Sequence, residues 1–292
     1  MILHPYQVVR ALYYGQRWRL KRFLRIPDQP RNPVVDGNHE AAYERHLRIC
    51  RLLNKAIQDF PSEQKGRVAC EIGSGDCLST ADLLLGSGFE KVYLVEKQPI
   101  IFDCRQYELL KDLSTLSELP NSLASLSDEN PPKISDHITI IPEYFENVKM
   151  PEKVDLIFSH DVIEHVEDLA GFFSGCARIL KPGGVMVHKF DLSGHEFFED
   201  PIPPLDFQTY PNWLYNLMFP KYRRSCRWFL QDILGSAKQC GFACISALIL
   251  NAADREYIEK LRPLLRKTGM FLTADQLSSL DVLIIMKLEH FR

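Results

Sequence analysis

The residues best placed to do chemistry begin with a glycine turn at 71–77, which reads Glu-Ile-Gly-Ser-Gly-Asp-Cys and follows an apolar run. Gly73 and Gly75 permit a tight turn and a close approach of a ligand to the backbone, because neither carries a Cβ. The helix expected next presents free N–H groups, and Asp76 is placed to cap it. A nucleotide-like ligand is therefore predicted here. Leu78 stands where an NAD fingerprint needs a third glycine, which weakens the case for an NAD(P)-dependent oxidoreductase.

Two further signals follow along the chain. Glu96 ends the next apolar run, roughly 20 residues beyond the glycine turn, where an acidic side chain can accept both hydroxyls of a ribose. The sequence Lys-Pro-Gly-Gly at 181–184 ends a helical stretch and turns the chain into another strand-like run. Alone it indicates only a turn.

A group of ionisable residues lies near the carboxyl ends of the apolar runs at 154–159 and 184–190, which neighbouring parallel strands would bring together. Each is a candidate base, a hydrogen-bonding group or a core residue. Three of them stand at i, i+3 and i+4, a spacing that shares one helical face and would suit a divalent cation such as Mn²⁺, Fe²⁺ or Zn²⁺. The group comprises His160, Asp161, Glu164, His165, His188, Asp191 and His195, and the three with that spacing are Asp161, Glu164 and His165.

These residues need a scaffold, and the hydrophobic pattern predicts one. Residues 40–60 have a helical period, whereas from 67 onward short, nearly continuous apolar runs alternate with amphipathic stretches. That alternation is typical of a mostly parallel sheet covered on both faces, the doubly wound α/β class. The predicted strands are 67–72, 91–96, 137–142, 154–159, 184–190, 242–250 and 281–288.

The same pattern suggests a domain division. Residues 1–66 are expected to form an N-terminal helical extension or lid, and residues 67–292 the main domain. Within it, 113–136 is rich in Ser, Pro, Asn and Asp and is predicted to be a long linker. The segment 191–229 is predicted to be an insertion, because its aromatic content far exceeds the 11% of the whole chain.

The ordered set of glycine turn, acidic strand end, Ile-Glu-His-Val at 163–166 and Leu-Lys-Pro-Gly-Gly at 180–184 resembles the class I S-adenosylmethionine-dependent methyltransferases, which have a seven-stranded Rossmann-like fold. The resemblance covers about residues 66–190. It implies S-adenosylmethionine as the cofactor, with Gly73 and Gly75 beside its methionine part, Glu71 near its amino group and Glu96 on the ribose. It also implies an adenine contact at Glu143, beside Tyr144 or Phe145, and places Ser159 and His160 near the sulfonium.

The activity that this resemblance implies is methyl transfer to a hydroxyl or amine of a small-molecule acceptor, achieved mainly by alignment and exclusion of water. His160 or His165 is expected to assist deprotonation, with Asp161 beside them and without a metal. The aromatic insertion is expected to cover the acceptor, because ligand pockets are largely aromatic and apolar. A metal-assisted hydroxyl methyltransferase and a non-catalytic cofactor-binding protein remain as alternatives. The predicted acceptor contacts are His188, Tyr210, Trp213 and Tyr215.

Composition and charge indicate which binding partners and which compartment to expect. The formal net charge of −3 does not favour nucleic acid, and no stretch is apolar enough to span a bilayer. Eight cysteines without a Cys-x-x-Cys pair indicate reduced thiols in a cytoplasm. The first 27 residues hold six Arg or Lys and no acidic residue, interleaved with apolar side chains. This segment predicts a basic amphipathic helix, which would face an anionic acceptor, an anionic membrane surface or simply water.

Overall fold

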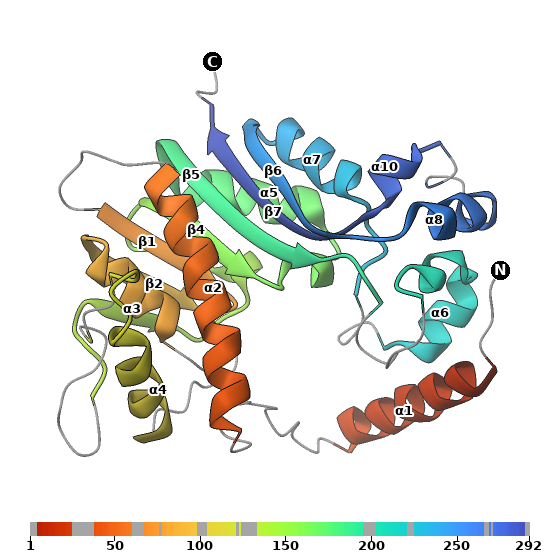
Figure 1. Ribbon diagram of the computed structural model, residues 1–292, viewed down its shortest axis with the longest axis horizontal. Helices are drawn as coiled ribbons and strands as arrows, with labels where there is room; N and C mark the ends of the chain where they lie inside the picture. The colour runs from red at the N-terminus through yellow and green to blue at the C-terminus, as the bar shows by residue number, and fades with distance from the viewer. Residues whose placement is uncertain are drawn as a thin grey trace.

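The structure is a computed structural model that describes residues 5–24, 38–59, 67–75, 78–97, 104–120, 123, 133–194, 203–220, 225–265, 269 and 271–289. Its centre is a single seven-stranded sheet with the order β3-β2-β1-β4-β5-β7-β6 (Figure 1). The strands are β1 Arg67–Ile72, β2 Phe89–Val95, β3 Ile138–Ile141, β4 Val154–His160, β5 Leu180–Asp191, β6 Phe242–Ala252 and β7 Ser279–Leu288.

The sheet confirms the predicted doubly wound, mostly parallel class. β1 to β5 pair in parallel, and β7 runs antiparallel to both β5 and β6. β1 and β4 are neighbours, although β2 and β3 lie between them in sequence. The strand order therefore reverses between β1 and β4, and in open α/β sheets a ligand binds at the carboxyl ends of the two strands that meet there.

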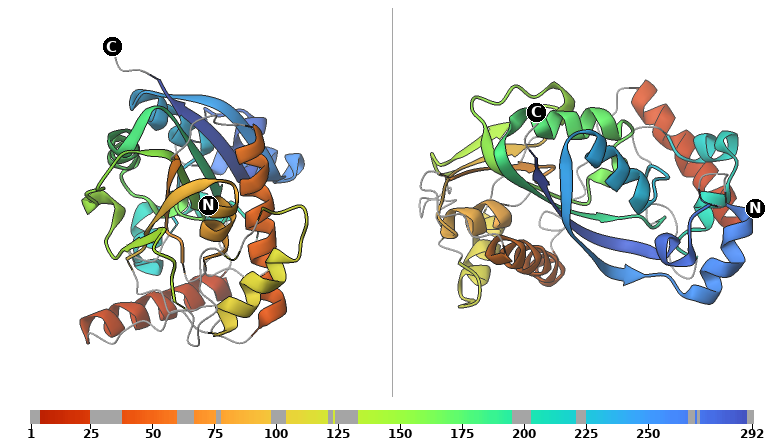
Figure 2. Two further views of the ribbon diagram at one scale, coloured as in Figure 1. Left: turned by 90° about the vertical axis from the view of Figure 1, so that its left-hand side faces the viewer. Right: turned by 90° about the horizontal axis from the view of Figure 1, so that it is seen from above.

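Helices cover the two faces of the sheet in separate layers, as the end-on views in Figure 2 show. One face packs against α2 His39–Asp59, α3 Ser79–Gly86 and α4 Cys104–Ser114. The other face packs against α5 Leu169–Ile179 and α7 Leu230–Gln239. Short 3₁₀ turns at η1 Phe145–Asn147 and η2 Ile163–His165 follow β3 and β4. We call the two faces the α2 face and the α5 face.

A third apolar cluster lies beyond the carboxyl edge of the sheet. It joins α1 Pro5–Phe23, the short helices of the 191–229 segment, and the elements that flank β6 and β7. The two helices of the predicted N-terminal extension thus separate, since α2 packs on the sheet and α1 packs on α6 (Figure 1). The remaining elements here are η3 Asp206–Thr209, α6 Asn212–Met218, α8 Arg255–Leu261, η5 Arg262–Leu264 and α10 Ala274–Leu277.

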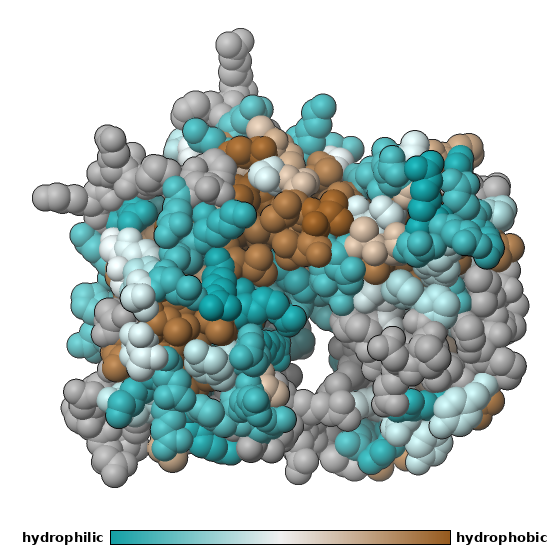
Figure 3. All heavy atoms as spheres, in the orientation of Figure 1, coloured by the Kyte–Doolittle hydropathy of each residue, from teal (hydrophilic) through white to brown (hydrophobic). Residues whose placement is uncertain are grey.

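The prediction that each apolar run is covered on both faces is wrong for β6. This strand is the edge of the sheet, and its residues 244–252 are all exposed. Ile245, Leu248, Ile249 and Leu250 retain between 38% and 44% of their surface. Apolar side chains gather over this part of the surface in Figure 3. In the described part of the chain, no helix has the length and apolar character needed to cross a membrane.

Candidate active site

The glycine turn lies where the strand order reverses, at the carboxyl end of β1. Gly73 and Gly75 have φ values of +71° and +65°, which side chains with a Cβ rarely adopt. The Gly73 amide donates to the Val95 carbonyl oxygen at 2.9 Å, and the Gly75 amide donates to Glu96 Oε2 at 3.1 Å. The turn is thereby fastened to the end of β2. Asp76, which the sequence predicted as a helix cap, lies outside the described residues together with Cys77.

Glu71 lies beneath this turn on the α2 face, with only 4% of its surface exposed. Its Oε2 accepts a hydrogen bond from the Thr80 hydroxyl. Burial raises the pKa of Glu71 to about 7, the Thr80 hydrogen bond opposes that rise, and the charge of Glu96 adds to it. Glu71 is therefore a buried carboxyl group with a raised pKa, held between β1 and α3.

At the end of β4, alternate residues point to opposite faces of the sheet, because strand side chains have a period of two. Ser159 is wholly buried on the α5 face, where its Oγ lies 2.7 Å from His188 Nδ1. The His188 ring also packs against Phe172 and Phe173 of α5, and burial lowers its pKa to about 3. Ser159 and His188 thus occupy core positions, and their contacts with cofactor and acceptor stay predictions.

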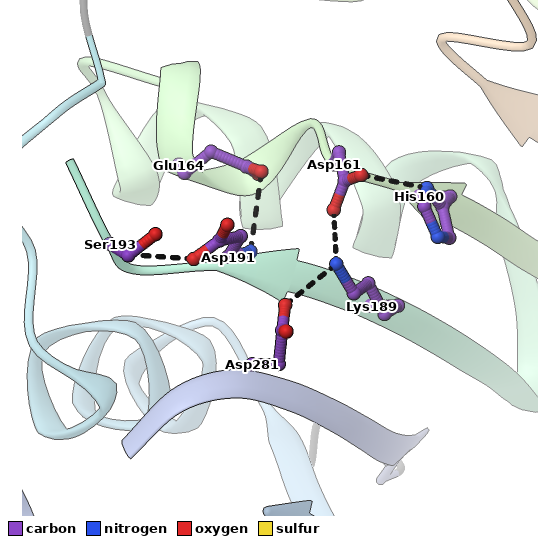
Figure 4. Close-up of polar contacts among 7 residues, drawn as sticks. All are labelled: His160, Asp161, Glu164, Lys189, Asp191, Ser193 and Asp281. Atoms are coloured by element: carbon purple, nitrogen blue, oxygen red, sulfur yellow. Dashed lines mark hydrogen bonds and ion pairs between the residues drawn. The ribbon is translucent and has the colours of Figure 1, made fainter. Parts of the chain in front are cut away.

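His160 points to the α2 face, opposite to Ser159, because side chains alternate along a strand. It pairs with the following residue, Asp161 (Figure 4). Its Nδ1 lies 3.1 Å from Asp161 Oδ2, and Asp161 has an unusual φ of +54°. Lys189, the register partner of His160 on β5, approaches Asp161 Oδ1 at 2.6 Å and Asp281 Oδ1 at 2.8 Å. Burial opposes ionisation of Asp161, but His160 and Lys189 together hold its pKa well below the usual range.

This arrangement orients the His160 ring. Nδ1 is engaged by the Asp161 carboxylate, whereas Nε2 is buried and has no hydrogen-bond partner among the described residues. A histidine whose Nδ1–H donates to a carboxylate has a lone pair on Nε2, as a general base requires. Lys189, which is itself paired with Asp281, contacts the other oxygen of the Asp161 carboxylate. Neither was among the predicted site residues, because only the pairing of β4 with β5 and of β5 with β7 brings them here.

His46 of α2 is a second imidazole on this face that the sequence did not single out. Its Nδ1 lies 2.9 Å from Ser79 Oγ, and its buried Nε2 has no partner in the described part of the chain. Burial lowers the pKa of His46 to about 4, with smaller contributions from the charges of Arg45 and His160. The helical periodicity of residues 40–60 predicted that His46 lies on the packed face of a helix. Periodicity alone does not show that this face reaches the carboxyl end of the sheet. Figure 3 shows an opening beside this edge, between α2 and α6.

The spacing of Asp161, Glu164 and His165 predicted one helical face, but the chain forms the 3₁₀ turn η2 there and the three side chains diverge. Asp161 turns to Lys189 and His160, whereas His165 is exposed. Glu164 is wholly buried and accepts from the Asp191 amide at 3.3 Å, and burial raises its pKa well above its ordinary value. The described residues contain no group of three His, Cys, Asp or Glu side chains that could hold a metal ion.

Glu143 and its neighbours lie beyond β3, where the adenine contact was predicted. Glu143 Oε1 accepts from the Tyr144 amide at 2.8 Å and from Asn147 Nδ2 at 3.2 Å, and both bonds lower its pKa. The Tyr144 ring is exposed beside the Lys97 ammonium, 5.4 Å from the ring centroid, whereas Phe145 is buried in the core. Tyr144 is therefore the aromatic side chain of this loop that is open to a ligand.

The aromatic residues of the insertion have three different environments. Tyr210 is wholly buried, and burial together with the charge of Asp206 raises its pKa to about 12. The Tyr215 hydroxyl donates to the Ser225 carbonyl oxygen at 2.6 Å, so this ring anchors the insertion. Trp213 is 68% exposed. Their contacts with an acceptor stay predictions, and His195 lies outside the described residues.

Comparison with known proteins fits this geometry. The sequence family described as Methyltransferase domain matches residues 110–188. The chain is therefore similar to this methyltransferase family over the segment that runs from α4 into β5. The matched segment begins after the glycine turn, and the family implies S-adenosylmethionine as the cofactor.

The relatives by sequence match only a short segment. Over 42 residues the chain is 43% identical to the Ubiquinone biosynthesis O-methyltransferase of Bradyrhizobium sp. (strain ORS 278), which covers 14% of this chain and 17% of that protein. The enzyme of the same name from Rhodopseudomonas palustris (strain BisB18) is 45% identical over 42 residues, 14% of this chain and 16% of its own length. The chain thus spans less than a fifth of the length of these curated relatives.

Among solved structures, a chain in the complex between the Haloferax volcanii Trm112 methyltransferase activator and a methyltransferase has a TM-score of 0.51 at 13% identity. That match covers 91% of this chain and 100% of the other. At this identity the similarity concerns the fold alone.

Proposed function

We propose that this protein is a methyltransferase that moves the methyl group of S-adenosylmethionine to a hydroxyl or amine of a small-molecule acceptor, with His160 as the base. The observation that carries the proposal is the His160–Asp161 pair at the end of β4, with Nδ1 and Oδ2 3.1 Å apart. It lies next to the point where the strand order reverses, which is where a ligand of this fold binds.

The glycine turn fits the cofactor. Both glycines have a positive φ, and a Cβ on Gly75 would meet no described heavy atom within 4 Å, so the turn borders open space. Ser74 Oγ is buried there without a partner among the described residues. Gly73, Gly75 and Glu71 would hold the methionine part and Glu96 the ribose, whereas Glu143 and Tyr144 would lie near the adenine. When bound, S-adenosylmethionine supplies a methyl group already activated by a sulfonium sulfur.

His160 would act on the acceptor. Its Nε2 would take the proton of the acceptor hydroxyl as the acceptor oxygen receives the methyl group, with S-adenosylhomocysteine as the leaving group. Asp161 stabilises the imidazolium that results and keeps Nδ1 protonated. Lys189 prevents Asp161 from turning away, because the two groups are 2.6 Å apart. His46 contributes a neutral imidazole on the same face.

A hydroxyl acceptor gains most from this arrangement, because a weakly acidic hydroxyl needs a base for methyl transfer. The relatives by sequence are ubiquinone biosynthesis O-methyltransferases, and this similarity supports the same preference. The described cysteines are free thiols, which supports placing the protein in a cytoplasm.

The first experiment measures cofactor binding and turnover separately. Calorimetry with S-adenosylmethionine and S-adenosylhomocysteine should give saturable binding to wild type and to His160→Gln alike. Transfer of a labelled methyl group to catechol and to simple amines should fall by about 10²–10⁴-fold in His160→Gln, the usual contribution of a general base. His165→Gln is the matched control, because that histidine is exposed in the adjacent turn. Full turnover by His160→Gln would refute the role of His160.

The divalent-metal alternative predicts a different result. It requires Asp161 to leave Lys189 and meet Glu164 and His165, which point apart in this structure. Turnover that a chelator abolishes and Mn²⁺ or Mg²⁺ restores would favour it. Cofactor binding without transfer to any acceptor tested would favour a non-catalytic role.

A further inference from the structure

Helix α1 presents two opposite faces, of which one is packed. Ala11 is buried and Gly15 lies directly against α6, where a Cβ on Gly15 would overlap the carbonyl oxygen of Met218. Arg19 donates to the carbonyl oxygens of Leu217 at 2.8 Å and Asn216 at 2.5 Å. The helix is therefore attached to the body of the protein in one orientation.

The opposite face of α1 is apolar and open. With 3.6 residues per turn, five large apolar side chains fall within about 60° of arc, nearly opposite Ala11 and Gly15. They keep between 55% and 74% of their surface exposed. An amphipathic helix ordinarily turns such a stripe toward the core, so this one is unpartnered on the described surface. We call it the outer stripe, and it consists of Tyr6, Val9, Tyr13, Leu20 and Leu24.

Positive charge accompanies the outer stripe. Residues 5–24 contain five cations and no acidic side chain, although the whole chain has a formal charge of −3. Arg10, Arg17 and Lys21 follow one another along the flank of the stripe, because positions 7 and 11 residues apart lie on the same side of a helix. Arg10 and Lys21 also lie over the rings of Tyr14 and Trp18, at 5.8 and 5.1 Å from the centroids.

We propose that the outer stripe and its flanking cations bind an anionic lipid surface, with α1 lying in the plane of the headgroups. A helix with aromatic and aliphatic side chains on one face and Arg or Lys beside them binds such surfaces through both apolar burial and electrostatic attraction. A nucleic acid would engage the cations and leave the stripe in water, whereas a second copy of the chain would bring like charges together. The proposal is independent of the methyl-transfer reaction.

The experiment is co-sedimentation of the full chain with vesicles of phosphatidylcholine alone or mixed with phosphatidylglycerol. Wild type should bind the mixed vesicles at least tenfold better than the neutral ones, and added salt should weaken that binding. Val9→Gln combined with Leu20→Gln should reduce binding at least tenfold with the charge unchanged. Arg17→Gln should reduce it by about fivefold, the effect of one cation near the surface. The matched control is Leu248→Gln, which removes an exposed apolar side chain on β6 instead.

Several results would overturn the proposal. Equal binding to neutral and anionic vesicles would exclude charge recognition, and unchanged binding by the Val9 and Leu20 double variant would exclude the stripe. Retention of an RNA oligonucleotide by that variant, without vesicle binding, would assign the cations to nucleic acid. A dimer in wild type that the variant loses, again without vesicle binding, would assign the stripe to self-association. Circular dichroism and thermal unfolding establish that each variant is folded.

Discussion

The two glycines of the glycine turn, Gly73 and Gly75, differ in what surrounds them. A Cβ on Gly73 would lie 2.6 Å from Val162 Cγ2, whereas one on Gly75 would project into open space. Gly75→Ala should therefore cost only about 1 kcal/mol of stability, from its positive φ, but at least tenfold in affinity for S-adenosylmethionine. Gly73→Ala should lose about 1–3 kcal/mol more stability than Gly75→Ala, because its Cβ would overlap the Val162 side chain. Denaturant unfolding and calorimetry measure the two effects.

The double variant Gly73→Ala with Val162→Ala separates overlap from backbone strain. Removing the two Val162 methyl groups should recover part of the stability that Gly73→Ala loses. If Gly75→Ala binds the cofactor as tightly as wild type, the turn does not contact the cofactor as proposed.

The sequence predicted as site residues those side chains that belong to a local motif, such as Glu71, Glu96 and the His160–Asp161 pair. It did not identify Lys189, because a lysine inside a strand gives no local signal of its neighbours. Lys189 joins the site through its register with His160 and through its ion pair with Asp281, almost a hundred residues later. Such contacts depend on strand pairing rather than on spacing along the chain.

Helices α1 and α7 each contain a glycine, Gly15 and Gly235. Only Gly15 is closely packed, so the two positions together test the effect of packing. Alanine stabilises an exposed helix interior by about 0.5–1 kcal/mol relative to glycine. Gly15→Ala should do the opposite, because its Cβ would overlap the Met218 carbonyl oxygen. We expect a loss of about 1–3 kcal/mol, with faster amide hydrogen exchange across residues 5–24 as α1 separates from α6.

The control for this prediction is Gly235→Ala in α7, where a Cβ would meet no described heavy atom within 4 Å. That variant should be slightly more stable than wild type. A Gly15→Ala protein as stable as wild type, with unchanged exchange in α1, would show that α1 does not pack on α6 in solution.

The positions of the strands along the sequence were predictable, but the place of β6 at the exposed edge of the sheet was not. Each of the seven apolar runs became a strand, because a short apolar run bounded by turns has few other stable arrangements. The run at 242–250 nevertheless lies at the exposed edge, since hydrophobicity alone does not distinguish an edge strand from a central one. The position of α1 was equally hidden, because its packing partner α6 lies about 200 residues further along the chain.

For the molecule as a whole, buried ionisable groups determine how stability varies with pH. Burial lowers the pKa of His46 to about 4 and that of His188 to about 3, so the folded protein keeps both rings neutral. Below pH 6.5 the unfolded chain takes up protons that the folded protein excludes, and stability falls as the pH drops. Glu71 acts in the opposite direction, because its raised pKa of about 7 removes stability as the pH rises from 4.5 through 7.

Replacement of one histidine tests this linkage. A histidine with a pKa of about 4 in the folded state and 6.5 in the unfolded chain costs roughly 2 kcal/mol of stability between pH 7.5 and pH 5. His46→Gln should therefore lose roughly 2 kcal/mol less than wild type over that interval, whatever its stability at pH 7.5. Denaturant unfolding at both pH values measures the difference. An identical loss in His46→Gln and wild type would show that His46 is accessible to protons in the folded protein, contrary to its burial in this structure.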